Sequence, residues 1–426
     1  MRDPRVWGIE PGFRDYTGVW RDAPAATIDA ILDAMGAGDT PPPAPVDPTH
    51  LTGRWRVETE DGGSVDVVGA VPPDLPWGYH WLVPLEGQGE RELLVRGPST
   101  CFMPGSLRTW GWAAQLYAAR STESWGMGDL ADLRRLAEWS REQGAGMLLV
   151  NPLHAASPGV PQEPSPYFPS SRCFRNPLYL RVDDPALAPW GRRLNDERRI
   201  DRDAVWRLKS VALENQYQSS DRGDGRFDRY CDEQGEILRR YATFCALTEV
   251  LGRPWTRWPE AARRPESPAV GRFADTYRER VRFHMWLQWL LDEQLQSAGE
   301  PVGLMQDLAI GVDAGGADAW MWQDSFVLGA RVGAPPDEFN TQGQDWGLPP
   351  FDPWRLRASH YEPFIRTVRA GLRHAGGLRF DHVMGLFRLY WIPEGLGADQ
   401  GAYVRYPHRQ LLDILALESH RAGAYV

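Results

Sequence analysis

A stripe of apolar residues at helical spacing, near residue 130, lies between two short apolar runs. The runs at 112–117 and 147–150 predict strands, and the second is apolar throughout, as in a parallel sheet covered on both faces. The helix between them is predicted to begin near Asp129 and to stop at Gly144. Its buried stripe consists of Leu130, Leu133, Leu136 and Ala137. Together these segments predict a β-α-β unit.

Further apolar runs that end in polar residues recur at 302–307 and 378–381, and an incipient strand lies at 424–426. Strands that alternate with helices in this way predict a parallel α/β core. In a (β/α)8 barrel, the carboxyl ends of the strands build the active site. Asp307 and Asp381 both lie at such predicted ends.

Other regions precede or interrupt this core. Helical spacing at 25–35 leads into a Gly- and Pro-rich linker, and alternating segments between 51 and 94 predict short antiparallel strands. The stretch 154–300 is too long for a connecting loop, and it includes a predicted amphipathic helix at 273–298 and a predicted solvated loop at 216–227. The predicted domains are 1–50, a helix and linker; 51–105, β-sandwich-like; and 106–426, the first half of a barrel with the insertion 154–300.

Composition narrows the classes of function. The net charge of -10 argues against nucleic-acid partners. The four cysteines have no metal-ligand or disulfide-framework spacing, and no stretch has the apolar length of a leader or a membrane span. A cytoplasmic protein without a membrane partner is therefore expected. The 20 Trp and 14 Tyr offer rings that can stack on sugars, although packing in cores explains most of them.

The segment Gly376–His382 reads GGLRFDH and sets Arg379 and Asp381 two residues apart on a predicted strand. Alternate residues of a strand share a face, so both side chains point the same way. An arginine at that distance favours the charged form of a carboxylate, which can then act as a covalent nucleophile in glycosyl chemistry. A structural ion pair at a strand end is the alternative that this motif alone leaves open.

Several motifs occur in the same order as in one known family. They are GWAAQLYAARSTESWGMGDL, NPLH, SPYFPSSRCFRNPLYL, QDLAIGVDAGGADAW, GAPPDEFNTQGQDWGLPP and GGLRFDHVMGL. Read together, they resemble the amylomaltases, the 4-α-glucanotransferases of glycoside hydrolase family 77. The resemblance runs from about residue 110 to the last residue, and the segment before it resembles the extra amino-terminal region of the longer bacterial members.

The resemblance implies a fold and an activity. The expected fold is α/β, a (β/α)8 TIM-type barrel that is incomplete here, about its first half, with a large helical insertion after strand two. The expected activity is transfer of α-1,4-glucan segments between maltooligosaccharides by a retaining double displacement, without metal or organic cofactor. The expected partners are maltooligosaccharides and α-glucans.

The resemblance also assigns roles to residues. Asp381 is the expected nucleophile that forms a glucosyl-enzyme ester, and Arg379 holds it charged and aligned. His382 is expected to hydrogen-bond sugar hydroxyls, with a core imidazole as the alternative. Asp307 corresponds to an aspartate that holds the site together, with a helix or strand cap as the alternative.

Three further residues are expected to bind substrate by resemblance. Tyr167 matches the tyrosine that stacks on the glucose unit at the cleaved bond, although its SPY triplet alone indicates only a turn. Gln344 and Trp346 match residues that line the acceptor and donor cleft, where an amide bridges hydroxyls and an indole stacks and donates. Leu348 stands where many members have an asparagine, which puts a contact from that position in doubt.

A retaining enzyme also needs a second carboxyl group, about 5 Å from the nucleophile, as acid and base. In the family this group is a glutamate at the end of the next barrel strand. The glutamates after Asp381 are Glu394, in a predicted loop, and Glu418, on a predicted helix at 409–420, and neither is predicted at a strand end. The chain is therefore expected to be a fragment that lacks the acid/base half of the site, is inactive alone and is prone to aggregate.

Two other functions stay open. An α-amylase-type hydrolase or a branching enzyme shares the barrel and the nucleophile and differs in the acceptor. A non-catalytic glucan-binding fragment would have lost the acid. Products from maltotriose separate transfer from hydrolysis, and binding without turnover indicates the third function.

Overall fold

The computed structural model describes residues 2–40, 42–86, 89–220 and 225–426. The chain forms two compact units, each built from segments that are far apart in the sequence. The first unit consists of Met1–Gly105, Asp324–Arg369 and His382–Val426, and the second of Ser106–Gln323 and Ala370–Asp381. The boundary after Gly105 coincides with a predicted one, but the first unit also takes in two later segments that were predicted to belong to the barrel. The predicted domains themselves stay a prediction.

The second unit is organised around a four-stranded parallel sheet. Its strands are β7 (Gly111–Ala114), β8 (Met147–Val150), β11 (Gly303–Leu308) and β14 (Gly377–Phe380). They lie in the order β14-β11-β8-β7, so each strand pairs with the next one of this set along the chain. The predicted strands at 147–150, 302–307 and 378–381 agree with β8, β11 and β14, with ends that differ by no more than one residue.

The first predicted strand is too long. Strand β7 ends at Ala114, and a 3-10 turn, η1 (Leu116–Ala118), replaces its last part. The amide of Leu116 donates to Oδ1 of Asn151 at 2.7 Å instead of to a neighbouring strand, which ends the ladder there. Residues 424–426 likewise do not extend as a strand: they follow helix α12 (His408–Ala422) with a single β-bridge residue.

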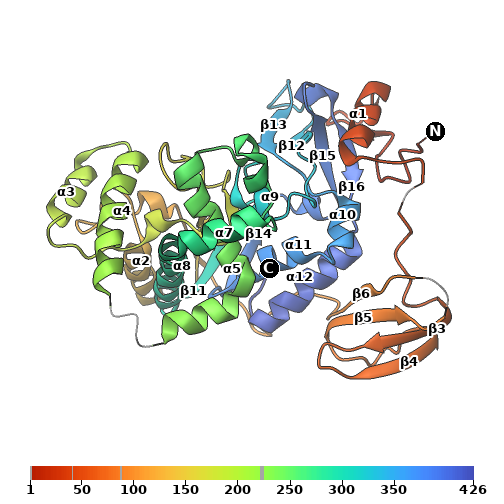
Figure 1. The fold of residues 1–426 in the computed structure, drawn as a ribbon, viewed down its shortest axis with the longest axis horizontal. Coiled ribbons are helices and arrows are strands. Elements are labelled where there is room, and N and C mark those ends of the chain that lie inside the picture. The colour runs from red at the N-terminus through yellow and green to blue at the C-terminus, as the bar shows by residue number, and fades with distance from the viewer. Residues whose placement is uncertain (1, 41, 87–88, 221–224) are drawn as a thin grey trace. The chain divides into compact units, whose positions relative to one another are not determined.

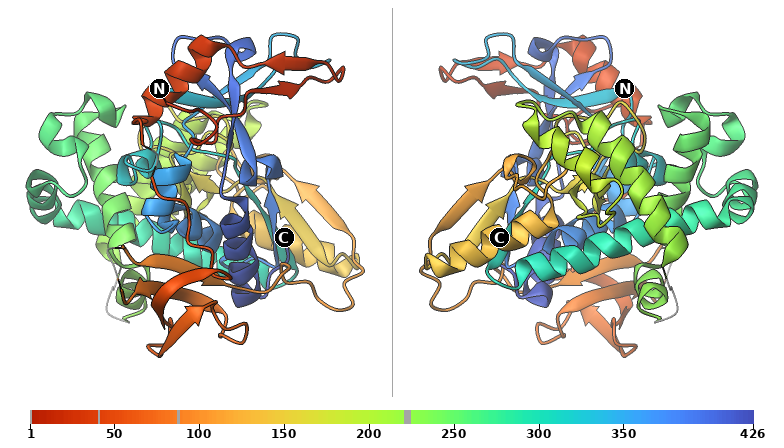
Figure 2. Two further views of the ribbon diagram at one scale, coloured as in Figure 1. Left: turned by 90° about the vertical axis from the view of Figure 1, so that its right-hand side faces the viewer. Right: turned by 90° about the vertical axis from the view of Figure 1, so that its left-hand side faces the viewer.

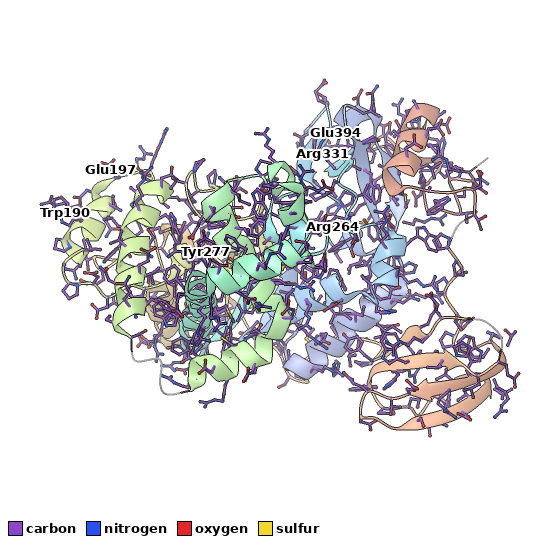
Figure 3. The ribbon with its side chains drawn as sticks, viewed as in Figure 1. Trp190, Glu197, Arg264, Tyr277, Arg331 and Glu394 are labelled. Atoms are coloured by element: carbon purple, nitrogen blue, oxygen red, sulfur yellow. The ribbon has the colours of Figure 1, made fainter. Side chains whose placement is uncertain are left out.

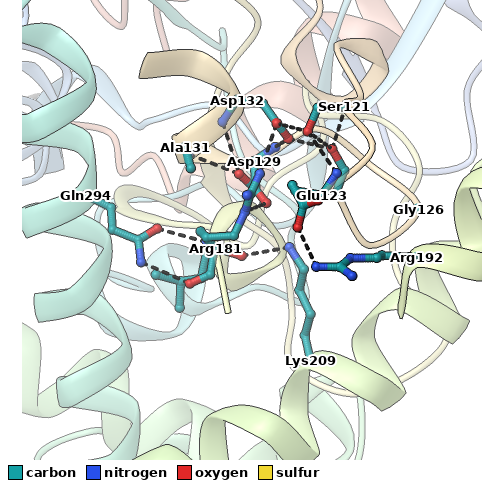
Figure 4. A network of polar contacts seen from close by, with 12 residues as sticks. Ser121, Glu123, Gly126, Asp129, Ala131, Asp132, Arg181, Arg192, Lys209 and Gln294 are labelled. Carbon is teal, nitrogen blue, oxygen red and sulfur yellow. Dashed lines mark hydrogen bonds and ion pairs between the residues drawn. The ribbon is translucent and has the colours of Figure 1, made fainter. Parts of the chain in front are cut away.

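Helix α2 (Leu130–Glu142) begins after Asp129, as predicted. The Asp129 carboxylate accepts from the amides of Ala131 and Asp132, and the Asp132 carboxylate accepts from the amide of Asp129, which is a reciprocal capping box. Arg181 donates to Asp129 at 2.6 Å and to Asp132 at 2.9 Å (Figure 4). Leu130, Leu133 and Ala137 of the predicted stripe are buried, and Leu136 is partly buried.

Lys209, the sole lysine of the chain, lies beside this network (Figure 4). Its side chain is 1% exposed, and Nζ donates to the carbonyls of Leu178 at 2.6 Å and Leu180 at 2.7 Å. Burial lowers the pKa of Lys209 to about 8, because a charged amine is poorly solvated in the interior.

The insertion 154–300 holds a short hairpin and a set of helices. The hairpin pairs β9 (His154–Ala155) with β10 (Ser171–Arg175). The helices are α3 (Ala188–Arg193), α4 (Arg202–Ser219), α5 (Arg226–Leu251), α6 (Glu260–Arg263), α7 (Pro268–Thr276) and α8 (Arg278–Gly299); α9 (Ala317–Met321) follows the insertion. Helices α5 and α8 pack along each other (Figure 1).

Two predictions within the insertion need correction. The predicted helix at 273–298 is two helices, because α7 ends at Thr276 and α8 begins at Arg278. Of the predicted loop at 216–227, residues 221–224 lie outside the described residues. The prediction is wrong for 216–219, which end α4, and for 226–227, which begin α5.

The first unit contains an antiparallel sheet that the sequence patterns did not predict. Its order is β13-β12-β15-β16, and its strands are β12 (Ala330–Ala334), β13 (Gln344–Leu348), β15 (Arg388–Pro393) and β16 (Ala402–Arg405). A hairpin of β1 (Gly12–Arg14) and β2 (Trp20–Asp22) lies beside β16 (Figure 2). The longer helices are α1 (Ala25–Met35), as predicted, α10 (Pro353–Ala358), α12, and α11 (Glu362–Leu372), which crosses the boundary between the units.

The strands predicted between residues 51 and 94 form one antiparallel sheet rather than the two layers of a sandwich. They are β3 (Leu51–Glu58), β4 (Ser64–Gly69), β5 (Gly78–Pro84) and β6 (Glu92–Arg96), in the order β4-β3-β5-β6. Among the described residues of this segment there is no second sheet. The buried apolar side chains of the sheet are Leu51, Val57, Val67, Leu82 and Leu94.

Candidate active site

Two acidic residues and an arginine meet at the carboxyl ends of β11 and β14. The two strands pair in parallel with Asp307 opposite Arg379, and Asp381 directly follows β14. Parallel strands bring their carboxyl ends to the same edge of a sheet, so the register alone places these residues together. The pairing continues one step further, because the amide of Asp381 donates to the carbonyl of Leu308 at 3.2 Å.

Arg379 bridges the two carboxylates. Its Nη1 donates to Oδ1 of Asp307 at 2.6 Å, and its Nη2 donates to Oδ1 of Asp381 at 2.9 Å. The Asp307 side chain is 5% exposed, whereas the Asp381 side chain is 29% exposed. Among the residues that the structure describes, the other carboxylate oxygen of Asp381 accepts no hydrogen bond. That oxygen is therefore available to a ligand.

The second oxygen of Asp307 is held by Tyr167. The phenol of Tyr167, in the loop between β9 and β10, donates to Oδ2 of Asp307 at 2.7 Å. Both oxygens of Asp307 thus accept hydrogen bonds from side chains. The SPY triplet is also a turn, because the amide of Tyr167 donates to Oγ of Ser165 at 3.3 Å.

Burial and charge oppose each other in this cluster. Burial raises the pKa of Asp307, and the hydrogen bonds from Tyr167 and Arg379 counteract that rise. Burial, followed by the hydrogen bond to Asp307, raises the pKa of Tyr167, so the phenol stays protonated and remains a donor. The hydrogen bond to Asp307 raises the pKa of Arg379, which keeps the guanidinium charged.

Three predicted substrate-binding residues form a second cluster, within the first unit. Gln344 and Trp346 are alternate residues of β13, so their side chains share a face. The indole N–H of Trp346 donates to Oε1 of Gln344 at 3.2 Å, and its ring meets the imidazole of His382 edge to face with centroids 5.1 Å apart. Leu348 of the same strand is buried, so its side chain offers no surface to a ligand.

His382 has a backbone conformation that residues other than glycine rarely adopt. Its φ of 51° and ψ of 59° lie in the left-handed region, where a side chain costs roughly 1 kcal/mol. The residue opens the 3-10 turn η5 (Val383–Leu386), and the amide of Gly385 donates to its carbonyl at 2.8 Å. The chain therefore turns sharply straight after Asp381. The His382 side chain is partly exposed, unlike a core imidazole.

Two buried residues that the sequence did not single out hold the loop after β11. Nη1 of Arg172 donates to the carbonyls of Ala309 at 3.1 Å and Ile310 at 2.8 Å. Nε2 of His154 accepts from the amide of Ala309 at 3.3 Å, which needs a neutral imidazole. Burial, followed by repulsion from Arg175 and Arg172, lowers the pKa of His154 well below its ordinary value. Their places in the motifs NPLH and SPYFPSSRCFRNPLYL were the signal that could have found them.

Glu394 lies in a turn, as predicted, but that turn follows a strand directly, which was not predicted. Glu394 directly follows β15, at the same end of its sheet as Arg331 of β12 (Figure 3). It therefore lies at a strand end, although the strand is antiparallel and not part of the sheet that carries Arg379. Glu418 lies on α12 as predicted, where it is buried and accepts from Tyr79 at 2.7 Å and Arg369 at 2.9 Å.

The described residues contain no group of three or more His, Cys, Asp or Glu side chains that could hold a metal ion. In the same part of the chain, no helix combines the length and the apolar character that a membrane span needs. None of the four cysteines, all of which the structure describes, is part of a disulfide bond.

Residues 114–426 match the glycoside hydrolase family 77, described as 4-alpha-glucanotransferase. A 4-alpha-glucanotransferase of Mycobacterium tuberculosis strain H37Rv is 45% identical over 414 residues, which cover 89% of this chain and 56% of that protein. One from Haemophilus influenzae is 35% identical over 395 residues, which cover 82% of this chain and 56% of that protein. The chain thus spans little more than half the length of these relatives.

Solved structures share the fold. The amylomaltase of Corynebacterium glutamicum superimposes with a TM-score of 0.85 and 32% identity, over 99% of this chain and 70% of that one. The amylomaltase of Streptococcus agalactiae in complex with acarbose gives a TM-score of 0.64 and 19% identity, over 75% of this chain and 68% of that one. The α/β fold of this chain is therefore the fold of an amylomaltase, as predicted.

Proposed function

Because the chain belongs to glycoside hydrolase family 77, we propose that the whole protein is a 4-α-glucanotransferase that transfers α-1,4-glucan segments between maltooligosaccharides. The names of the relatives from Mycobacterium and Haemophilus support this activity. The chain spans 56% of their length, so the proposal concerns the protein to which residues 1–426 belong. The proposed partners are maltooligosaccharides and α-glucans, and the proposed compartment is the cytoplasm.

The proposed architecture is a (β/α)8 barrel of which this chain supplies the first four strands. Strands β7, β8, β11 and β14 pair in parallel in chain order, as consecutive barrel strands do. The long insertion lies between the second and third of them. Asp307 and Asp381 lie at the carboxyl ends of the third and fourth, the end at which barrel enzymes carry their active sites.

The observation that carries the proposed mechanism is the guanidinium of Arg379 between two unequal carboxylates. Asp307 has both oxygens bound, whereas Asp381 is more exposed and keeps one oxygen available. We assign Asp381 as the nucleophile and Arg379 as the group that aligns it through their hydrogen bond. Asp307 and Tyr167 in turn hold Arg379, and the ring of Tyr167 is proposed to stack on the glucose unit at the cleaved bond.

The proposed reaction has two displacements. The free oxygen of Asp381 bonds to C1 of a glucosyl unit while the bond from C1 to the glycosidic oxygen breaks and that oxygen takes a proton from an acid. An acceptor hydroxyl then gives a proton to the same group and attacks C1, which releases Asp381. Gln344, Trp346 and His382 are proposed to bind sugar hydroxyls and faces. Neither step needs a metal or an organic cofactor.

The acid and base is a second carboxyl group. Glu418, on helix α12, already accepts hydrogen bonds from Tyr79 and Arg369. These bonds do not suit the role of acid and base. It therefore stays a prediction that the group lies outside residues 1–426 and that these residues alone are inactive. An assay of residues 1–426 beside the protein from its complete reading frame tests this point directly.

The proposed activity is tested with maltotriose and the Asp381→Asn variant of the complete protein. Transfer gives glucose and longer oligomers, whereas glucose and maltose alone would identify a hydrolase. The variant should lose activity by on the order of 10³-fold or more, because the covalent intermediate cannot form. Asp66→Asn is the matched control, since Asp66 is also paired with an arginine, Arg56, at 2.7 Å. An Asp381→Asn variant that disproportionates maltotriose at the wild-type rate would refute the assignment of Asp381 as the nucleophile.

A further inference from the structure

An open pocket of about 470 Å³ lies between hairpin β1–β2 and the edge of the antiparallel sheet. The hairpin is the red pair of strands beside the blue strands β15 and β16 in Figure 2. The pocket is lined by an indole and three arginines, from Trp20, Arg14, Arg388 and Arg405, together with the carboxylate of Glu10. All of these residues belong to the first unit, and none has a part in the proposed reaction.

Trp20 is fixed as a half-exposed ring. Its side chain lies across Gly12 of the neighbouring strand so closely that a Cβ there would come within 2.8 Å of the indole. The indole N–H donates to Oδ1 of Asp22 at 2.7 Å, which fixes the rotation of the ring. The residue is nevertheless 48% exposed. A rigid aromatic ring open to solvent at a pocket is a surface on which a sugar can stack.

Two of the arginines lie opposite each other on neighbouring strands. Arg388 and Arg405 are direct cross-strand partners of β15 and β16, and like charges in that arrangement repel. Glu10 pairs with Arg388 at 2.6 Å and compensates one of the two charges. Among the described residues, the guanidinium of Arg405 has no hydrogen-bond or ion-pair partner. An anion bound here would relieve the repulsion.

The third arginine adds to the positive charge. Arg14 lies directly opposite Trp20 on the hairpin, and its Nη1 donates to the carbonyl of Gly18 at 2.9 Å, which leaves its other donors free for a ligand. The pocket lining therefore holds three guanidinium groups and one carboxylate, in a chain whose net charge is -10. Such a local excess of positive charge attracts anions, and guanidinium groups match the geometry of phosphate oxygens.

We propose that this pocket binds a phosphorylated sugar. The phosphate lies between Arg388, Arg405 and Arg14, and the sugar ring stacks on Trp20. The volume suits a ligand of one or two sugar rings, since small-molecule sites start at about 300 Å³. The proposal is independent of the proposed transferase function, because it uses no residue of that site.

The test is calorimetric titration of the protein with glucose 1-phosphate, glucose and inorganic phosphate in parallel. We expect glucose 1-phosphate to bind more tightly than either of the others, and its affinity to fall as salt is added. Arg405→Gln should weaken binding roughly tenfold, because one charge-assisted hydrogen bond is lost. Trp20→Ala should weaken it by about the same factor through the loss of stacking. Arg21→Gln is the matched control, since Arg21 adjoins Trp20 but pairs with Asp15 outside the pocket.

Thermal unfolding separates loss of binding from loss of folding. Arg405→Gln removes a repelling charge, so the variant should unfold at an unchanged or higher temperature without ligand. Glucose 1-phosphate should raise the unfolding temperature of the wild type more than that of the variant. Equal affinity for glucose and glucose 1-phosphate would overturn the phosphate part of the proposal, and equal affinity for inorganic phosphate would overturn the sugar part. Unchanged affinity in both pocket variants would overturn the site.

Discussion

Removing the guanidinium of Arg379 should destabilise the fold through Asp307. In the Arg379→Gln variant, the Asp307 carboxylate would remain almost fully buried with only the phenol of Tyr167 as its partner. Removing one partner of a buried ion pair typically lowers the free energy of unfolding by roughly 3–5 kcal/mol, because the remaining charge is poorly solvated. Arg379 itself is 42% exposed, so solvent already screens part of the interaction. We therefore expect a loss of about 2 kcal/mol in the free energy of unfolding near neutral pH.

The loss should depend on pH with a definite sign. Burial already holds the pKa of Asp307 above its ordinary value, and the loss of Arg379 raises it further. A carboxyl group with a higher pKa in the folded state binds more protons when folded, so its burial costs less as the pH falls toward the folded pKa. The destabilisation of Arg379→Gln should therefore shrink between about pH 7 and about pH 5.

Urea unfolding curves of four proteins measure the effect: wild type, Arg379→Gln, Asp307→Asn and the double variant. The double variant should recover most of the loss at neutral pH, because a neutral amide can be buried and can still accept from Tyr167. Arg331→Gln is a surface control, since Arg331 pairs with the partly exposed Asp345 at 2.7 Å, and should cost less than about 1 kcal/mol. A loss of unfolding free energy in Arg379→Gln no larger than that in Arg331→Gln would contradict the prediction. So would a loss that neither a lower pH nor the added Asp307→Asn change reduces.

Two further predictions concern the network at the start of α2. The pKa of Lys209 is about 8 in the folded chain against 10.5 ordinarily, so the wild type should gain up to roughly 3 kcal/mol relative to Lys209→Met as the pH rises from about 8 to about 10. Urea unfolding at a series of pH values checks this, and a difference that does not vary with pH would contradict it. Asp129→Ala removes both the cap and the partner of Arg181, and should cost about 2–4 kcal/mol. The control is Asp201→Ala, which removes the exposed N-cap of α4 and should lower the free energy of unfolding by about 1 kcal/mol. Equal losses for the two variants in urea unfolding would argue against a contribution from the buried network.

Strands β8 and β11 of the parallel sheet could be predicted from the sequence because all of their residues are buried or partly buried, on both faces of the sheet. Runs such as 147–150 are apolar throughout, and such runs differ from the alternating pattern of half-exposed strands. The cap and stripe of α2 are local signals of the same kind, since residues within one turn determine them. Strand β7 was predicted too long because the side chain of Asn151, from a distant segment, binds the amide of Leu116 and ends the ladder.

The antiparallel sheet of the first unit could not be predicted in this way. Strand β12 pairs with β15, and the whole of β14 lies between them in the chain. Strand β13 reads QDWGL, with polar residues and glycine where a strand pattern would show alternation. Its place depends on pairing with β12, a contact that no local pattern reveals. For the same reason strand β15, which ends at Pro393 directly before Glu394, was not predicted.

The candidate site was only partly accessible to sequence reasoning. The spacing of Arg379 and Asp381 is local, and the structure brings the two side chains within 2.9 Å. The pairing of Asp307 with Arg379 depends on the register of β11 against β14, which the sequence does not specify. The left-handed backbone of His382 was also hidden, because an isolated histidine carries no signal for positive φ.

The site around Asp381 and the pocket beside Trp20 differ in net charge, so they favour different ligands. With both carboxylates ionised, Asp307, Arg379 and Asp381 together carry one negative charge, which would stabilise the positive charge that develops at C1 in the proposed glycosyl transfer. The same negative charge repels a phosphate. The pocket beside Trp20 has the opposite balance, so it favours a phosphorylated sugar over a neutral glucan. Added salt should therefore weaken binding of a sugar phosphate to the pocket while leaving the binding of neutral maltotriose almost unchanged, because screening acts only on a charged ligand.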